Sequence, residues 1–89
     1  MPVMMISEVR GQSSQGYDAM LALVGSSLRQ APGFIMHVAH QTDDGWRIVE
    51  VWNSREDATA FFAAHIAPQL PDGVRPKLSF QLLHSLVNN

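Results

Sequence analysis

One hairpin constrains the fold of this chain more than any other segment. The stretches Phe34–Gln41 and Trp46–Trp52 are both rich in β-favouring side chains, and the turn Thr42–Gly45 separates them. This turn ends in Asp-Gly, a pair that is favoured in tight hairpin turns. We therefore predict two antiparallel strands joined by a tight turn, with side chains that alternate between the two faces of a sheet.

A strand and a helix are expected before the hairpin. Val3–Val9 is apolar and predicts a first strand, and the polar segment Gly11–Gly16 predicts a loop. From Tyr17 onward the apolar residues recur at helical spacing, so a helix is predicted to begin there. The run Ala31–Gly33 contains proline and glycine and should end this helix. The apolar stripe consists of Tyr17, Met20, Leu21, Val24 and Leu28.

A helix and a strand are expected after the hairpin. Ser54 is a suitable N-cap, and Asp57 stands three residues later in the capping-box position. This helix should run to about Ala67, because prolines follow it, and Leu78–Val87 then predicts a fourth strand. The order β-α-β-β-α-β is the ferredoxin-like α+β arrangement, which we expect as a single domain over residues 1–89.

The apolar content of the sheet predicts a second copy of the chain. Two helices cover only one face of a four-stranded sheet, and the other face carries Val38, Val49 and Val51. An exposed apolar face of this size is unusual in a monomer. The hydrophobic fraction of 46% in only 89 residues points the same way. We therefore expect a homodimer whose sheets pack face to face.

Composition excludes several classes of function. The formal net charge is −2 and the six basic residues are scattered, which argues against binding to nucleic acid. The absence of cysteine excludes disulfides, thiol catalysis and thiolate metal sites. No secretory signal and no membrane-spanning stretch stand out, so a soluble cytoplasmic protein is expected.

A family resemblance rests on the hairpin and the segments that flank it. Pro32-Gly33-Phe34, the segment Asp44–Trp52, the cap Ser54 and a helix with Phe61-Phe62 are similar to antibiotic-biosynthesis monooxygenase-like domains of the dimeric α/β-barrel superfamily. The resemblance covers roughly residues 3–87. It implies a dimeric α/β barrel with a small-molecule pocket between the sheet and the two helices.

The resemblance does not select one reaction. Relatives include cofactor-free oxygenases of aromatic polyketides, haem-degrading enzymes, chlorite dismutases, isomerases, polyketide cyclases and stress-responsive proteins. The described motifs are therefore more informative about the fold than about the chemistry.

Strand alternation brings three candidate residues together. Trp52 matches the tryptophan that faces the pocket in the oxygenase relatives, and Glu50 then shares its face. A two-residue hairpin loop places His37 opposite Glu50 or Trp52. A carboxylate beside an imidazole fixes the imidazole tautomer, and such a pair suits a general base near neutral pH. The alternative is a structural His–Glu pair, with Trp52 in the core.

The second helix offers a further histidine. His65 shares an inward stripe with Ala58, Phe61 and Phe62, so it is predicted to face the pocket; the alternative is a solvated side chain at the helix C-terminus. A helix histidine binds iron in the haem-degrading relatives. The spacing from Trp52 to His65 is longer here, and Ser7 stands near the position of their strand-one asparagine. These departures argue against haem, and no histidine pair has metal-ligand spacing, so we expect no cofactor and no metal site; a haem-binding protein is the third alternative.

Together with the family resemblance, these residues predict a cofactor-independent, monooxygenase-like enzyme acting on a small aromatic or polyketide-like molecule. His37, helped by Glu50, would be the general base, and His65 or Tyr17 would stabilise the oxyanion. Trp52 would position the ring, while Phe62 and Met36 would line the pocket. The alternatives are a polyketide cyclase or isomerase of the same fold, and a non-catalytic small-ligand-binding or stress-responsive dimer.

Overall fold

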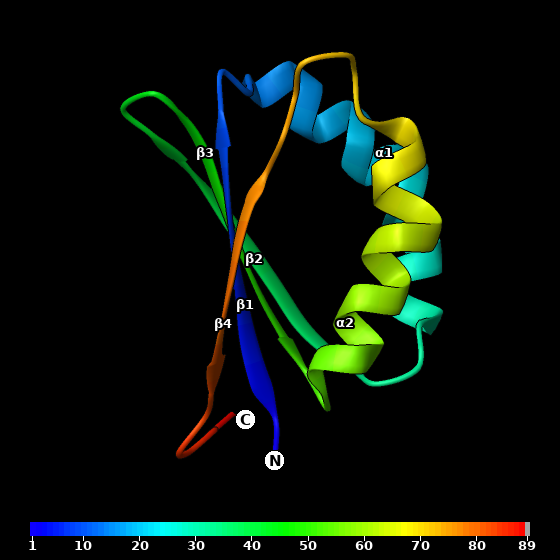
Figure 1. The fold of residues 1–89 in the computed structure, drawn as a ribbon, viewed down its shortest axis with the longest axis vertical. Coiled ribbons are helices and arrows are strands. Elements are labelled where there is room, and N and C mark those ends of the chain that lie inside the picture. Colours follow the sequence, from blue (N-terminus) through cyan, green and yellow to red (C-terminus); the bar gives the residue numbers. More distant parts are fainter. Residues whose placement is uncertain (89) are drawn as a thin grey trace.

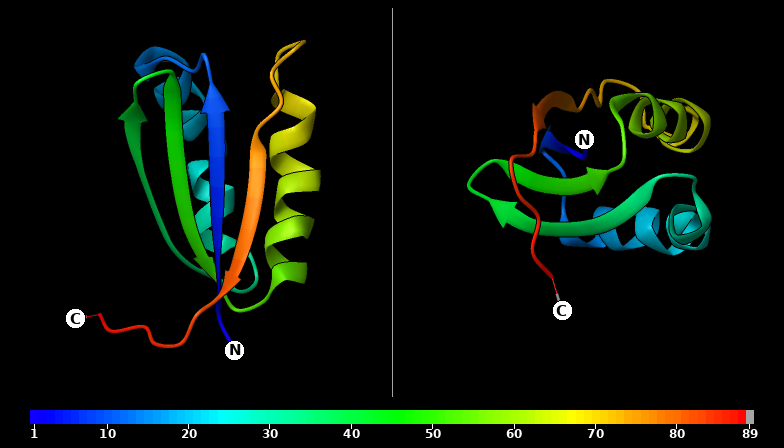
Figure 2. Two further views of the ribbon diagram at one scale, coloured as in Figure 1. Left: turned by 60° about the vertical axis from the view of Figure 1, so that its left-hand side comes forward. Right: turned by 90° about the horizontal axis from the view of Figure 1, so that it is seen from below.

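A four-stranded antiparallel sheet carries the helices on one face (Figure 1). The computed structural model describes residues 1–88. The strands lie in the order β2-β3-β1-β4, which Figure 2 shows from left to right in its left-hand view. The ferredoxin-like α+β fold is therefore confirmed. The strands are β1 (Val3–Arg10), β2 (Phe34–Thr42), β3 (Gly45–Trp52) and β4 (Lys77–Leu82).

The two helical segments differ in regularity. α1 (Ser14–Gln30) is an unbroken α-helix, whereas α2 (Arg55–Phe61) passes into a π-helical turn, η1 (Phe62–Ile66), and a short 3₁₀ turn, η2 (Ala67–Gln69). In the π turn the amide of Ala67 donates to the carbonyl of Phe62, five residues back. This wider turn decides which later side chains face the sheet.

The hairpin forms as predicted. Thr42 pairs with Gly45 and His37 pairs with Glu50, so all pairs from the turn to His37 keep one register. An irregularity between Phe34 and Met36 shifts the register at the far end of β2. The shift lies beyond His37 and leaves the pairing of His37 with Glu50 unchanged.

The first helix begins earlier than predicted. Ser13 is its N-cap, with a side-chain oxygen that accepts a hydrogen bond from the Gly16 amide at 3.0 Å, and Ser14 is the first helical residue. The prediction of a loop up to Gly16 is therefore wrong. The first turn is polar and solvent-facing, so it lacks the apolar periodicity on which the prediction rested, whereas the cap itself stabilises the turn.

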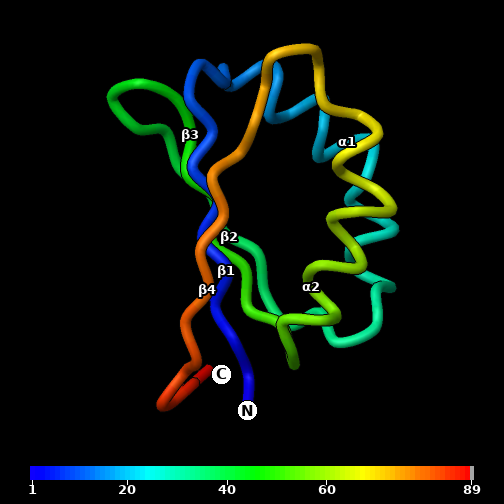
Figure 3. The backbone as a smooth tube through the Cα atoms, in the orientation of Figure 1, coloured from blue at the N-terminus to red at the C-terminus, as the bar shows by residue number. Residues whose placement is uncertain are grey.

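The last strand ends earlier than predicted. β4 stops at Leu82, which pairs with Val3, the first residue of β1. The strand β1 begins at Val3, and beyond the last pair the Leu83 amide donates one hydrogen bond to the Pro2 carbonyl at 3.0 Å. The ladder between β1 and β4 therefore ends at this pair. Figure 3 shows the segment after β4 bending sharply at the end of the molecule where both chain termini lie.

The core lies between the sheet and the helices. Val3, Met5 and Trp52 from the sheet pack against Val24 and Leu28 of α1 and against two buried residues of α2. Those two residues are Ala58 and Phe61. Trp52 has no exposed surface, and its ring contacts the rings of Phe34 and Phe61 at centroid distances of 5.4 and 5.6 Å. Burial of these apolar side chains is the main stabilising contribution to the fold.

The three valines expected on the opposite face of the sheet differ in how far they are exposed. Val38 is 52% exposed, Val49 is half-buried, and Val51 is already buried within one chain. The homodimer stays a prediction, since the structure contains one chain.

Gly33 is a position where an added side chain meets both an unfavourable backbone conformation and a neighbouring side chain. Its φ is +82°, a region that disfavours residues with a Cβ, and a Cβ here would overlap the side chain of Asp57. Gly33→Ala should lower the free energy of unfolding by about 2–4 kcal/mol in a denaturant titration. Gly73→Ala is the matched control, because φ there is +84° and no atom lies within 4 Å of the added Cβ. It should lose only about 1–2 kcal/mol; equal losses would contradict the overlap at Gly33.

Candidate active site

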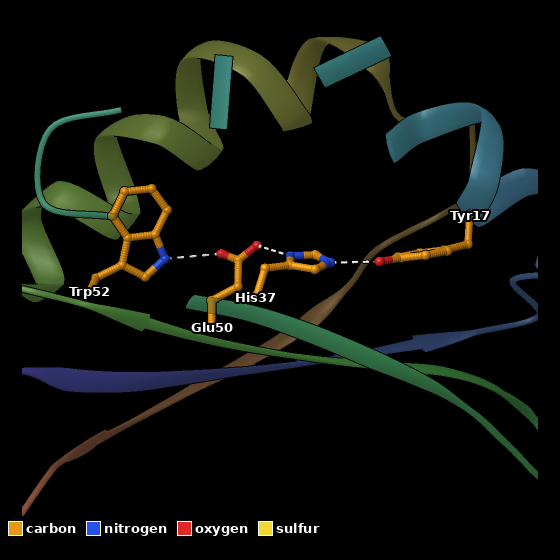
Figure 4. A network of polar contacts seen from close by, with 4 residues as sticks. All are labelled: Tyr17, His37, Glu50 and Trp52. Atoms are coloured by element: carbon orange, nitrogen blue, oxygen red, sulfur yellow. Dashed lines mark hydrogen bonds and ion pairs between the residues drawn. The ribbon is translucent and has the colours of Figure 1, made fainter. Parts of the chain in front are cut away.

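Four side chains from three elements form one continuous chain of hydrogen bonds (Figure 4). The Tyr17 hydroxyl lies 2.6 Å from Nε2 of His37, and Nδ1 of His37 lies 2.7 Å from Oε2 of Glu50. The indole Nε1 of Trp52 donates to Oε1 of Glu50 at 3.0 Å. The series runs from the beginning of α1 to the centre of the core.

Strand geometry explains the inner part of this network. His37 and Glu50 are direct cross-strand partners on β2 and β3, so their side chains leave the sheet side by side on one face. Trp52 follows Glu50 by two residues on the same strand and therefore shares that face. The expected grouping of these three residues is thus seen in their hydrogen bonds.

A second tryptophan, on the sheet, holds the ring of Tyr17 in place. The Tyr17 ring stacks on Trp46 of β3, with ring centroids 5.4 Å apart and an interplanar angle of 25°. The Tyr17 amide donates to the Ser13 carbonyl at 2.9 Å, in the first turn of α1. Helix start and sheet together therefore direct the Tyr17 hydroxyl towards His37.

The donors and acceptors in the network follow from the chemistry of each group. An indole N–H only donates, so Glu50 must accept at Oε1. When Glu50 is ionised it also accepts at Oε2, which puts the His37 proton on Nδ1 and leaves Nε2 as an acceptor. The Tyr17 hydroxyl then donates its single proton to Nε2. Glu50 is only 7% exposed, so these donors replace the water that its carboxylate lacks.

The environment favours the protonated form of Tyr17. Burial raises the pKa of its hydroxyl above the ordinary value of 10.0, and the nearby charges of Glu50 and Asp18 raise it further. Tyr17 is therefore a neutral hydrogen-bond donor over the physiological pH range.

A small apolar cavity of about 70 Å³ lies against this network, between the sheet and the helices. Its floor includes Met5, Ser7 and Ile48, and Leu21 of α1 forms part of its wall. Gln12, in the loop before α1, and Pro76, before β4, also line it. The loops that carry them lie at the same end of the molecule in Figure 1. Among the described residues that line the cavity there is no lysine or arginine, so a protonated histidine is the one positive charge that this lining offers.

Two predicted contact residues line this cavity together with His37 and Glu50. They are Tyr17 of α1 and Phe62 of η1. Their roles towards a ligand remain predictions, but their positions agree with the expected pocket between the sheet and the helices.

Three other predicted residues do not reach the cavity, and their predicted positions there are wrong. Trp52 is fully enclosed by the core, so its ring cannot stack on a substrate. Met36 alternates with His37 along β2, and its side chain therefore belongs to the other face of the sheet. His65 is exposed and lies in a separate groove between the end of α1 and α2.

The position of His65 has a clear physical cause. A regular α-helix would place His65 on the same inward stripe as Phe61 and Phe62. The π turn contains about one residue more than an α-helical turn, so Ile66 lines the cavity in place of His65. The His65 ring instead stacks on the outer side of Phe61, with centroids 4.8 Å apart.

One residue that contacts the site, Trp46, was not identified from the sequence. Trp46 supports Tyr17, and its Nε1 is buried without a hydrogen-bond partner among the described residues. Trp46 has the same strand parity as Glu50 and Trp52, so alternation could have placed it on the helix-facing side.

The described residues contain neither a cluster of metal-ligating side chains nor a helix that could span a membrane. Within residues 1–88, no group of three or more His, Cys, Asp or Glu side chains converges on a point. Neither described α-helix is long and apolar enough to cross a membrane.

Comparison with known proteins identifies the family. The model of the antibiotic biosynthesis monooxygenase family matches residues 3–66, most of the chain, and the protein therefore belongs to this family. A search of curated proteins gave no match.

Solved structures support the same fold. SnoaB, a cofactor-independent oxygenase from Streptomyces nogalater, is 13% identical with a TM-score of 0.72, over 99% of this chain and 98% of that one. MhuD, a haem-degrader from Mycobacterium tuberculosis, is 18% identical with a TM-score of 0.65, over 97% and 99%. A monooxygenase-like protein from Shewanella loihica, 18% identical, has a TM-score of 0.59 over 96% of each chain. At these identities the likeness concerns the fold alone.

The described residues do not fit a haem group. The cavity of about 70 Å³ is far smaller than a porphyrin, and both ring nitrogens of His37 already have partners. His65, the one histidine on a helical segment within residues 1–88, lies in the groove outside the cavity.

The bond between Trp52 and Glu50 should contribute measurably to stability. Trp52→Phe keeps an aromatic ring but removes a donor from a buried carboxylate, which should lower the free energy of unfolding by about 3 kcal/mol. Trp46→Phe is the control, because its Nε1 has no partner to lose; it should lose about 1 kcal/mol. Circular dichroism in a denaturant series measures both. Similar losses for the two variants would argue against a stabilising Trp52–Glu50 bond.

The raised pKa of Tyr17 can be observed directly, because it is the only tyrosine in the chain. In a spectrophotometric titration the tyrosinate band should appear above pH 10.0 in the folded protein and near the ordinary value in denaturant. Folding thus favours the protonated phenol. Its contribution to stability is fully present below pH 10.0 and is lost as the pH rises through the native pKa. Glu50→Gln should bring the native midpoint closer to the denatured one; a native midpoint at or below 10.0 would contradict this environment.

Proposed function

We propose that this chain, as one antibiotic-biosynthesis-monooxygenase-like domain, is a cofactor-independent enzyme that oxygenates a small aromatic substrate by general-base catalysis. His37 is the base and Glu50 orients and stabilises it. The observation that carries the proposal is the unbroken series Tyr17–His37–Glu50–Trp52 beside an apolar cavity. A His–carboxylate pair held in this way has the arrangement of a general base.

The chemistry needs one base and a dry site. Removal of an acidic proton leaves a substrate anion that is electron-rich enough to react with O₂. One oxygen atom then enters the product in place of two hydrogens, and the other leaves with those hydrogens as water. No external reductant is required. The apolar lining limits competing reactions with water.

The cavity restricts the substrate. About 70 Å³ is less than the roughly 150 Å³ of an engineered cavity that binds benzene. Flexible lining residues such as Met5, Met20 and Leu21 must therefore change rotamer to admit even a single ring. A small aromatic molecule is favoured over a large polyketide for this reason.

A non-catalytic dimer that binds a small ligand is the second candidate. The small cavity and the two hydrogen-bonded nitrogens of His37 favour it, because a base that acts directly on a substrate needs a ring nitrogen free to accept the proton. A cyclase or isomerase of the same fold would use the same base without O₂.

Oxygen uptake separates these functions. The wild-type protein is incubated with a panel of one-ring and fused-ring phenols and followed with an oxygen electrode. His37→Gln should lower the uptake rate by about 10²-fold or more, because the base is lost. Oxygen-independent conversion of the same compounds, detected by product analysis, would favour the cyclase or isomerase.

His40→Gln is the matched control. His40 lies on the same strand, is exposed, and bonds only to the carbonyl of Gln41. This variant should keep the wild-type rate. If no compound is converted, or if both variants equal the wild type, general-base catalysis at His37 is refuted and the binding module is preferred.

A further inference from the structure

We propose that Tyr17 is the residue that meets the substrate, and that it passes the substrate's proton inward to His37. The inference rests on the proposed function and concerns the order of groups within that site. It makes Tyr17 a catalytic residue, and His37 the group that accepts the proton from Tyr17.

The first support is that His37 has no free ring nitrogen. Nδ1 is bonded to Glu50 at 2.7 Å and Nε2 to the Tyr17 hydroxyl at 2.6 Å. A substrate that approached His37 directly would have to displace one of these partners. Glu50 is buried and is also held by Trp52, whereas Tyr17 is only partly buried and lines the cavity. Of the two partners of His37, Tyr17 is therefore the more accessible to a ligand in the cavity.

The second support is the unused capacity of the Tyr17 oxygen. Its single proton is donated to Nε2, so its lone pairs remain available to accept a further hydrogen bond. Tyr17 lines the cavity, and the phenol stays neutral, because burial and Glu50 disfavour its anion. An acidic hydroxyl in the cavity can therefore donate to Tyr17.

The third support is that Tyr17 does not depend on His37 for its position. Trp46 supports the ring from the sheet, and the capped first turn of α1 fixes the backbone. The Tyr17 and His37 rings are inclined by only 20°, with centroids 6.0 Å apart. A preorganised phenol of this kind is suited to transfer a proton without a large rearrangement.

The proton balance of the step is simple. The bond between the acidic hydrogen and the substrate oxygen breaks, and that hydrogen forms a bond to the Tyr17 oxygen. The original Tyr17 proton moves to Nε2 of His37. Tyr17 is neutral before and after, His37 becomes an imidazolium beside the Glu50 carboxylate, and the substrate becomes an anion that accepts a hydrogen bond from Tyr17.

A different role for Tyr17 makes the opposite prediction. If Tyr17 only blocked Nε2 of His37, the hydrogen bond between the Tyr17 hydroxyl and Nε2 would have to break before the base could accept a proton. Removal of the hydroxyl would then expose Nε2 and increase proton abstraction. The relay predicts that the same change decreases it.

The experiment uses 4-nitrophenol, a single-ring probe whose anion absorbs at longer wavelength than its neutral form. The probe is titrated with protein at a pH below its own pKa, and the bound anion is measured by absorbance. The wild-type protein should ionise bound probe. Tyr17→Phe, which keeps the ring on Trp46, should reduce the bound anion relative to bound neutral probe by about tenfold or more, since the first acceptor is missing.

Coupling between the two residues provides a second readout. His37→Gln should lose ionisation to a similar extent, and the double variant Tyr17→Phe/His37→Gln should be no worse than either single variant, as expected for groups that act as one unit. His40→Gln should ionise the probe like the wild type. Thermal unfolding of each variant identifies any that fail to fold, and for such a variant Tyr17→Leu replaces Tyr17→Phe and His37→Asn replaces His37→Gln.

The outcomes separate the relay from the proposed function. Ionisation by the wild type that is lost in both single variants supports the relay. Equal or greater ionisation in Tyr17→Phe, together with loss in His37→Gln, overturns the relay and keeps His37 as the direct base. A wild-type protein that does not bind the probe or leaves it neutral overturns both.

Discussion

The buried carboxylate of Glu50 is the constraint on which the rest of the site depends. A charge so far from water is stable only when donors surround it, and the chain supplies these from two directions. Trp52 donates from the core, and His37 donates from the neighbouring strand. Because the carboxylate fixes the tautomer of the imidazole, and that tautomer accepts the proton of the Tyr17 phenol, one ionised group sets the direction of every proton in the network.

This dependence links stability and chemistry in one set of residues. Trp52 belongs to the hydrophobic core and to the hydrogen-bond network at once, so core packing and the position of the base cannot vary separately. The Tyr17 end is different. It is anchored by stacking on Trp46 and by the beginning of a helix, and it borders the cavity, where a ligand would make its contacts. The network therefore runs from the buried core to the edge of the cavity.

The sequence predicted the sheet side of this site well and the helix side less well. The parity of the hairpin was sufficient to pair His37 with Glu50, because alternation is a property of the backbone and the tight turn fixed the register. It could not show that Trp52 is fully enclosed, since that depends on Phe34 and Phe61, which are distant in sequence. The error at His65 arose because helical periodicity assumes a constant number of residues per turn. The overlong fourth strand arose because strand propensity does not reveal where the partner strand begins.

The π turn also accommodates an extra residue in the helical segment after β3. The segment from Arg55 to Gln69 holds about one residue more than a regular helix lining the same cavity, and the surplus is taken up between Phe62 and Ile66. Phe61 and Phe62 before the turn and Ile66 after it all still face inward. Ala63 and Ala64, both exposed, occupy the bulge. Deletion of one residue there would shorten this helical segment and turn the π turn into a regular α-helical turn, with the side chains that line the cavity unchanged.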